Sequence, residues 1–556
     1  MDTVSESGFK MPNFNLSSKL NNIGSFYRNR KKPCSQSINI NPCANVVDAD
    51  SPSIDGAMFF LSSSNGLCGN LSFGKKSILF EFGRDLGESH SANSSIPLDP
   101  TEPKCPIKEE PVRNSYAIDF LNIGDIYAEQ STDHLSITIF CQNFKHVKIS
   151  LKQSEIASAI IDKIKTISFD NMVQSNVESR ICLWEYLYQN YPYRQNSDWV
   201  EQEKWYISNF KIRLTNFNEI GTCNSLPDTI IVPRDLQDHM LDRLASLSVG
   251  NRVPLITFLY RKSSHMIVRC SSFREQNLQD LVPRSTITPL RELSIDAIFA
   301  ELNDIEKQYS RLRKHCFAVT KQSDHLSTAN QENEHESKFW SKCSHWLYAL
   351  SKVLRFVTTL VNIVKHEATA ALTESNDNRW NCVLSSLVQI VLDPHRRTVA
   401  GFESLLSKEW IYLSGYKSRS PGSNRVRQVN HLPNSTFFIL FLDCVHQLIA
   451  QNPRSFEFTT IYLISLVDMQ FTTDSFKREA AKRFEVNKAH SLICNPLYTG
   501  SLGSTTADSE EPQINAHITQ IRFFYLLFFR HIKSDTLKFL PAESVLWNEA
   551  LRRSLV

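Results

Sequence analysis

A short polar stretch between two apolar runs is the feature that most limits how this chain can fold. Ala370-Ala371-Leu372 has the composition of a buried strand, and Leu384 to Leu392 has that of a buried helix. The residues between them, from Thr373 to Trp380, are almost all polar. A strand, a tight loop and a helix start point backbone N–H groups at one place, and the helix N-terminus favours negative charge there. The sequence therefore predicts an anion-binding loop.

The loop lacks the side chains that phosphoryl-transfer chemistry needs. Phosphatases of the Cys-x5-Arg type place a thiolate at the start of such a loop and an arginine six residues later. The thiolate attacks phosphorus, and the arginine holds the phosphoryl oxygens. Glu374 and Trp380 stand at those two places here. None of the thirteen cysteines has an arginine six residues on, and no glycine occurs from 371 to 400. The sequence predicts that the geometry of the anion-binding loop is present and that phosphoryl-transfer activity is lost.

We therefore treat the loop as a candidate site without catalytic residues. Its members are Thr373, Glu374, Ser375, Asn376, Asp377, Asn378, Arg379 and Trp380. Glu374 is expected to bring negative charge to the position where a phosphate would bind, and to accept hydrogen bonds from the N–H groups that would hold that phosphate. Two alternatives remain: Arg379 could turn into the anion site, and Cys382 could be a reactive thiol rather than a small core residue.

Composition excludes several other classes of function. A net charge of +3 over 556 residues gives no global signal for nucleic-acid binding. The cysteines are scattered without zinc-ligand spacing, and no metal or cofactor site is expected. The N-terminal residues lack the pattern of a secretion signal, which favours a cytoplasmic protein. The longest apolar runs, Val353–Val364 and Phe523–Phe529, are shorter than the ~20 residues of a spanning helix, so we predict core helices.

The N-terminal third of the chain is predicted to be a disordered tail followed by a strand-rich region. Residues 1–55 are rich in Ser and Asn and too poor in large apolar groups to order themselves. Residues 56–175 predict a small barrel with a terminal helix at 152–166 and a flexible insertion at about 84–113. Three stretches carry the strand signal: Leu67–Phe82 with a turn at Gly74-Lys75-Lys76, His134–Cys141, and Val147–Leu151.

The remainder reads as a larger α/β domain at 176–545 and a tail at 546–556. Its clearest helix is Phe339 to His366, where apolar residues recur at three- and four-residue steps. Residues 416–433 are basic and 499–513 are polar, so both predict exposed loops.

Several separated segments resemble the myotubularin phosphoinositide phosphatases. They occur in the family's order and are Arg213–Asn218 with Cys223–Pro227 and Ile231–Pro233, Gly250–Pro254 with Val268–Cys270, Leu392–Phe402 with Lys408–Trp410, Phe441–Gln447, Arg454–Phe458, and Asn495–Tyr498. The most specific is Leu392-Asp-Pro-His-Arg-Arg-Thr-Val-Ala-Gly-Phe402. The resemblance implies a cysteine-phosphatase fold, with a central sheet flanked by helices. It also implies that residues 56–175 are the family's PH-GRAM domain, which Gly69–Phe73 and Ile137–Phe144 fit.

The resemblance fails at the family's active-site pattern, His-Cys-Ser-Asp-Gly-Trp-Asp-Arg-Thr. The matching run is Thr373-Glu-Ser-Asn-Asp-Asn-Arg-Trp-Asn381, which shares only Ser375. The chain is thus similar to the family's inactive subgroup of pseudophosphatases, or 3-phosphatase adapters. That subgroup implies an adapter or regulatory subunit for an active myotubularin phosphatase, cytoplasmic and peripheral on endosomal or other intracellular membranes.

Two alternatives stand beside the adapter. The first is a stand-alone module that binds phosphoinositide membranes without an enzyme partner. The second is an active lipid 3-phosphatase with unusual chemistry.

Overall fold

The structure is a computed structural model of the 556-residue chain. Apart from a few isolated positions, it describes residues 54–61, 67–73, 77–82, 115–130, 134–152, 182–191, 212–223, 225–274, 289–323, 332–414, 435–472, 493–498 and 511–529. Residues 1–53 of the expected N-terminal tail, the insertion at 84–113, the loop at 416–433 and the tail at 546–556 lie outside these ranges, as do most of the helix at 152–166 and most of the polar segment at 499–513. Ile54 and Asp55 were predicted as part of the tail but begin the first strand.

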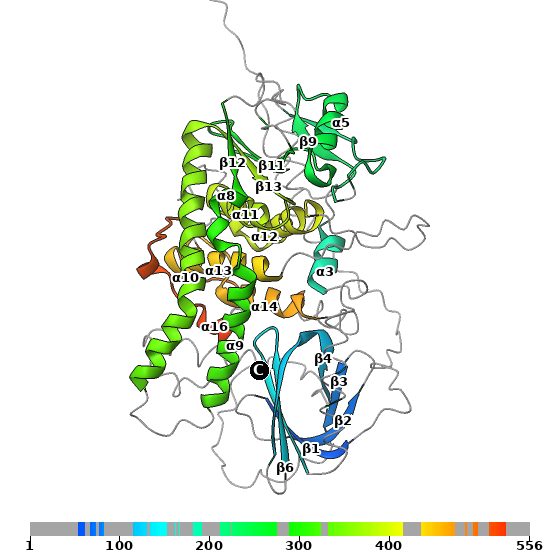
Figure 1. Ribbon diagram of the computed structural model, residues 1–556, viewed down its shortest axis with the longest axis vertical. Coiled ribbons are helices and arrows are strands. Elements are labelled where there is room, and N and C mark those ends of the chain that lie inside the picture. The colour runs from blue at the N-terminus through cyan, green and yellow to red at the C-terminus, as the bar shows by residue number, and fades with distance from the viewer. Residues whose placement is uncertain are drawn as a thin grey trace, which may run out of the picture. The chain divides into compact units, whose positions relative to one another are not determined.

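The strand-rich region forms one curved, seven-stranded antiparallel sheet (Figure 1). Its strands are β1 (Ile54–Leu61), β2 (Leu67–Phe73), β3 (Ser77–Phe82), β4 (Ser115–Asp119), β5 (Ile123–Gln130), β6 (His134–Cys141) and β7 (His146–Lys152). They are ordered β4-β3-β2-β1-β7-β6-β5, and alternate residues of β6 and β7 are buried. The strands predicted on both sides of the Gly74-Lys75-Lys76 turn and at 134–141 and 147–151 are therefore confirmed.

The larger region is a mixed α/β structure around a four-stranded sheet. Its sheet is ordered β10-β11-β13-β12, from Leu255–Leu259, Met266–Ser271, Thr369–Glu374 and Leu290–Ser294, and β8 (Ile212–Thr215) pairs with β9 (Ile230–Pro233) in a separate two-stranded sheet. β13 lies between β11 and β12 and runs parallel to both. Because ligand sites in such sheets lie beyond the carboxyl ends of the strands, this position places the loop after β13 at a site edge.

Helices complete this region. They are α3 (Cys182–Asn190), α5 (Asp238–Leu247), α8 (Ile295–Ile298), α9 (Ile305–Ser323), α10 (Glu332–Asn362), α11 (Trp380–Leu392), α12 (Val399–Leu406), α13 (Ser435–Gln451), α14 (Thr460–Gln470) and α16 (Tyr525–Phe528). All residues of α11 are buried, and α11 lies against β10, β11 and β13 on one side and against α10 and α13 on the other. A helix this apolar on every face is the expected centre of a core.

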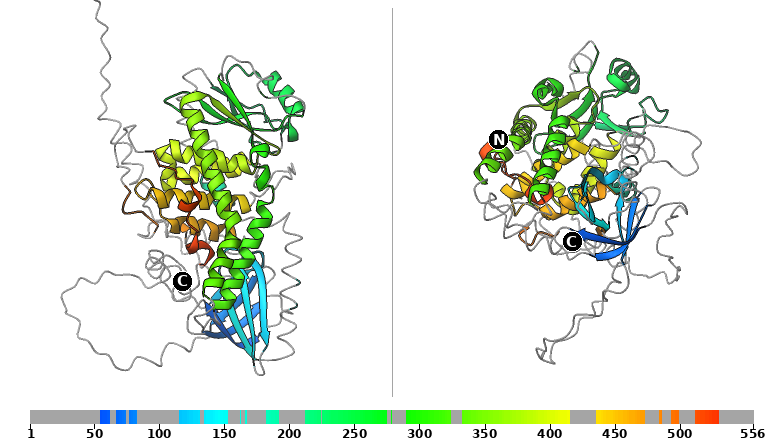
Figure 2. Two further views of the ribbon diagram at one scale, coloured as in Figure 1. Left: turned by 60° about the vertical axis from the view of Figure 1, so that its left-hand side comes forward. Right: turned by 60° about the horizontal axis from the view of Figure 1, so that its bottom comes forward.

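The helix predicted at 339–366 is confirmed but begins earlier. α10 starts at Glu332 and continues into a π-helical turn at Ile363–Glu367, and it runs alongside α9 in Figures 1 and 2. Residues Cys343–Glu367 are long and apolar enough to span a membrane, yet most are buried against other parts of the protein. Trp346, Leu350 and Val357 are among the fully buried residues, which agrees with a core helix.

The prediction of a core helix at Phe523–Phe529 was only partly right. The run is mostly buried, but only Tyr525–Phe528 is helical. Its aromatic rings pack against one another, for example Phe523 and Phe528 at 5.1 Å between centroids and 34° between planes. The run is therefore apolar because its large side chains fill the core, and not because one face of a helix is buried.

Candidate functional site

The predicted strand, loop and helix are present at the candidate site. β13 ends at Glu374, residues 375–379 form the turn, and α11 begins at Trp380. The strand and the helix are both longer than the apolar runs suggested, so the turn is short. Asp377 has a φ of 50°, a left-handed conformation that a non-glycine residue adopts only when its surroundings hold it.

The Glu374 carboxylate occupies the N-terminus of α11. Its Oε1 accepts the N–H of Trp380 at 2.9 Å, and its Oε2 accepts those of Asn381 at 3.1 Å and Arg379 at 3.3 Å. These are donors that a helix start otherwise leaves unsatisfied. Burial raises the pKa of Glu374 to about 7, although the three N–H groups act to lower it. Only 2% of the residue is exposed, so the chain's own carboxylate takes the place that an anion would take.

Trp380 fills the position six residues after Glu374 with an aromatic ring. Its indole stacks on Phe299 at 4.4 Å between centroids and 17° between planes, and it meets Phe437 edge-on at 4.8 Å. Only 4% of the residue is exposed. Trp380 therefore packs as a core residue, with no charge to offer a ligand.

Arg379 points away from the helix N-terminus. Its guanidinium lies over the ring of Phe437, 5.9 Å from the centroid, and Nη2 is 3.9 Å from Oε1 of Glu306. About half of the side chain is exposed. In this structure the arginine lies outside the anion site, in contrast to the alternative in which it turns inward.

Asp377 lies between two buried arginines. Its Oδ2 accepts Nη2 of Arg252 at 2.7 Å and Nε at 3.2 Å, and its Oδ1 accepts Nε of Arg269 at 2.9 Å. Nδ2 of Asn381 donates to the same Oδ1 at 2.7 Å. Burial alone would raise the pKa of Asp377, but Arg269 and Arg252 hold it below its usual value. The loop is thus fixed by a charged carboxylate in a fully buried place.

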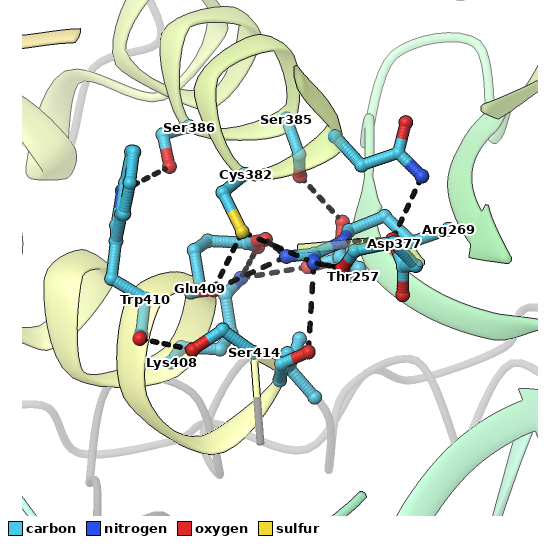
Figure 3. A network of polar contacts seen from close by, with 12 residues as sticks. Thr257, Arg269, Asp377, Cys382, Ser385, Ser386, Lys408, Glu409, Trp410 and Ser414 are labelled. Atoms are coloured by element: carbon cyan, nitrogen blue, oxygen red, sulfur yellow. Dashed lines mark hydrogen bonds and ion pairs between the residues drawn. The ribbon is translucent and has the colours of Figure 1, made fainter. Parts of the chain in front are cut away.

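The network continues from Asp377 through Arg269 into a cluster of polar side chains that includes Glu409, as Figure 3 shows. Arg269 donates from Nη1 to Oε2 of Glu409 at 2.7 Å, and Glu409 in turn accepts Nε2 of Gln389 at 2.7 Å. Nζ of Lys408 donates to Oε1 of Gln389 at 2.6 Å. Each of these buried groups has a partner of opposite charge or a hydrogen bond, which is what allows them to lie inside a core.

Cys382 is part of this network and is not an activated nucleophile. Nη2 of Arg269 donates to its Sγ at 3.3 Å. Burial raises the pKa of the thiol to about 12, whereas a nucleophilic cysteine needs a lowered pKa and access to solvent. The alternative that Cys382 is reactive is not supported by this environment.

The other loop residues hold the backbone or face solvent. Oγ1 of Thr373 donates to the carbonyl of Leu293 at 3.0 Å. The N–H and Oγ of Ser375 both donate to Oδ2 of Asp296, at 2.8 and 2.5 Å. Asn376 is exposed and Asn378 is half-buried. In the described part of the chain, no group of His, Cys, Asp and Glu side chains is placed to hold a metal ion.

Sequence reasoning missed three residues that hold the loop. Arg252 and Arg269 pair with Asp377, and Glu409 pairs with Arg269. Arg269 lies inside the apolar strand Met266-Ile-Val-Arg-Cys270, where a lone charge signals a buried ion pair. Its partners cannot be chosen from the sequence, because Asp377 and Glu409 are more than 100 residues away along the chain.

Comparison of the sequence with known proteins identifies the family of this chain. The model of the myotubularin-like phosphatase domain matches residues 174–280 and 289–476. Myotubularin-related protein 10-B of Xenopus laevis is 33% identical over 276 residues, which are 46% of this chain and 33% of that protein. Human myotubularin-related protein 12 is 27% identical over 288 residues, 49% of this chain and 36% of that protein.

A third relative matches over a longer stretch. Mouse myotubularin-related protein 9 is 24% identical over 383 residues, which are 61% of this chain and 67% of that protein. The matched part is about a third of the length of the two relatives named before it. The family expected from the separated motifs is therefore confirmed, and this chain belongs to the family of proteins with a myotubularin-like phosphatase domain.

Proposed function

We propose that this chain is a catalytically inactive member of the family, a pseudophosphatase. One observation carries the proposal: the Glu374 carboxylate accepts the N–H groups of residues 379, 380 and 381. A phosphoryl group bound at this loop would need those same donors. The site is thus filled by a side chain of the protein itself, which any substrate phosphate would have to displace from these donors.

Charge makes the exclusion stronger. An ionised Glu374 and one phosphate charge about 4 Å apart would repel by about 4 kcal/mol at an effective dielectric near 20. Because burial raises the pKa of Glu374 to about 7, this repulsion applies above that pH, whereas the occupied N–H donors exclude a phosphate at any pH. A thiolate nucleophile and a phosphate-holding arginine are also absent at their positions, Glu374 and Trp380. Losing either member of one catalytic unit removes most of its activity.

The test is phosphate release from phosphatidylinositol 3-phosphate by the purified chain, with an active myotubularin measured in parallel. We expect no turnover above buffer. Glu374→Cys alone should also be inactive, because Trp380 and Asp377 remain in place. Turnover by the native chain that disappears in Glu374→Ala would overturn the proposal and favour the alternative of an active enzyme with unusual chemistry.

We further propose that the chain serves as an adapter or regulatory subunit for an active phosphoinositide 3-phosphatase of the same family. The support is that the phosphatase-like core is intact around a filled site, with Arg252, Arg269 and Glu409 arranged to hold the loop. A phosphatase-like fold that has these loop contacts but lacks the catalytic groups is suited to binding a partner protein and not to catalysis. Affinity purification of the full chain from its own cells should recover an active myotubularin in a stoichiometric complex. Recovery of the chain alone under conditions that preserve heteromers would contradict it.

The alternative is a membrane-binding module without an enzyme partner. The observation that favours it is the seven-stranded antiparallel sheet of β1–β7, which fits the proposed PH-GRAM domain. Under either proposal the protein would be cytoplasmic and peripheral on intracellular membranes. Flotation of the full chain with liposomes that contain phosphatidylinositol 3-phosphate, against liposomes without it, measures this binding. Selective flotation combined with no recovered partner would favour the module over the adapter.

A further inference from the structure

The turn between β6 and β7 has a backbone conformation that its residue types do not favour. Hydrogen bonds from the N–H of Cys141 to the carbonyl of Lys145, at 2.7 Å, and from the N–H of Phe144 to the carbonyl of Cys141, at 3.0 Å, close the turn. Phe144 has a φ of 64°, in the left-handed region where Gly and Asn are usual. A large aromatic residue with this backbone persists only where the surrounding structure over-determines it.

The Phe144 ring supplies that constraint, because it is buried among rings from distant helices. It meets Phe528 of α16 edge-on, at 4.8 Å between centroids and 84° between planes. Tyr309 and Phe317, both on α9, lie at 6.5 and 6.2 Å. Only 5% of Phe144 is exposed, so this ring from the seven-stranded sheet is packed into the hydrophobic core of the helices.

A second aromatic contact and a set of polar contacts surround the ring. Phe140 at the end of β6 stacks on Phe317 at 5.0 Å and 29°. Asp468 of α14 accepts Nδ2 of Asn143 at 2.9 Å and lies 3.4 Å from Nζ of Lys145. Nη1 of Arg313, on α9, donates to Oε1 of Gln142 at 3.3 Å.

This arrangement resembles the anatomy of a protein–protein interface within one chain. A buried aromatic residue at the centre and hydrogen-bonded polar groups at the rim are the usual features of an energetic hot spot. We propose that residues Gln142–Lys145 form an anchor that couples the seven-stranded sheet to helices α9, α14 and α16, with Phe144 as its central residue. The two parts of the chain then resist local opening together. The proposal concerns mechanical coupling and does not depend on the proposed function.

The test separates anchoring from a simple role in the turn. Phe144→Asn and Phe144→Gly both suit a left-handed φ, so they preserve or relax the turn while removing the ring. If Phe144 served only the turn, both variants would be as stable as the native chain or more so. If it is an anchor, hydrogen exchange of the full chain should rise at least tenfold both in the β6–β7 hairpin and in α9, and urea unfolding should split into two transitions.

Two further variants keep the test decisive. Asp468→Asn weakens the polar rim and leaves the ring in place, so it should raise exchange in the same two segments by less than the ring variants do. Tyr127→Ala removes an aromatic residue that is 38% exposed on β5, and it should change neither segment. Native-like exchange in α9 for every Phe144 variant that folds would overturn the proposal. If no Phe144 variant folds, native-like exchange in Asp468→Asn would overturn it.

Discussion

The charge at residue 377 is expected to be a main stabiliser of the degenerate loop, and Asp377→Asn tests this directly. The substitution keeps the shape of the side chain and removes one negative charge. In the native protein the two guanidinium groups of Arg252 and Arg269 face two carboxylates, Asp377 and Glu409, in a region that is 4% exposed or less. The variant removes the carboxylate that pairs with Arg252, because Glu409 is already shared by Arg269 and Lys408.

The expected cost follows from burial. Breaking a buried ion pair by removing one partner costs about 3–5 kcal/mol, because the remaining charge stays desolvated. Asp377 also accepts four hydrogen bonds, three of them from arginine nitrogens, and asparagine can accept only the two at its single amide oxygen, because its NH2 group is a donor. We therefore expect the free energy of unfolding of the Asp377→Asn variant to fall by about 3–5 kcal/mol at pH 7.

Urea denaturation followed by tryptophan fluorescence measures this loss, since Trp380 and Trp410 are buried beside the network. Asp238→Asn is the matched control. Asp238 also pairs with an arginine, Arg213 at 2.6 Å, but its side chain is 58% exposed. Exposed pairs contribute about 1 kcal/mol or less. If Asp377→Asn costs no more than Asp238→Asn, the reasoning about burial is wrong.

Three other outcomes can be measured in the same way. Because burial raises the pKa of Glu374 from 4.5 to about 7, its contribution to stability is complete below pH 4.5 and is lost as pH rises through 7, by about 3 kcal/mol. Glu374→Gln should remove that part of the pH dependence; an unchanged slope between pH 5 and 7 would argue against a buried acid. Asp443, whose pKa burial also raises to about 7, accepts Nε1 of Trp346 at 2.8 Å. Asp443→Asn should therefore be less destabilising at pH 8 than at pH 5, and the reverse order would contradict this. Trp380→Ala should cost about 3–5 kcal/mol by leaving a cavity beside Phe299 and Phe437, whereas a cost below 1 kcal/mol would mean that the rings do not pack as described.

Local pattern predicted the elements of the site well. An apolar run, a polar stretch and a second apolar run indicated a strand, a loop and a helix, and β13 and α11 are both present. Alternation in His134–Cys141 indicated a strand with the bounds that β6 has. These signals are short-range, because periodicity reports which face of an element is buried.

Local sequence pattern predicted secondary structure less well where an apolar run consists of large side chains without helical periodicity. The seven-residue apolar run Phe523–Phe529 suggested a helix, yet only Tyr525–Phe528 is helical. Aromatic rings that stack on one another can fill a core without regular backbone, so apolar content alone does not fix the type of element.

The sequence by itself determined the identity of the loop residues, and with it the absence of a cysteine and an arginine at the two decisive positions. It also supported the family through motifs kept in order along the chain. Only the tertiary structure decided that the Glu374 carboxylate turns inward onto the helix N-terminus, and that Asp377 is held between Arg252 and Arg269. The physical reason is distance along the chain. Hydrophobic periodicity acts between neighbours, whereas a buried charge is stabilised by whichever opposite charge folding brings to it.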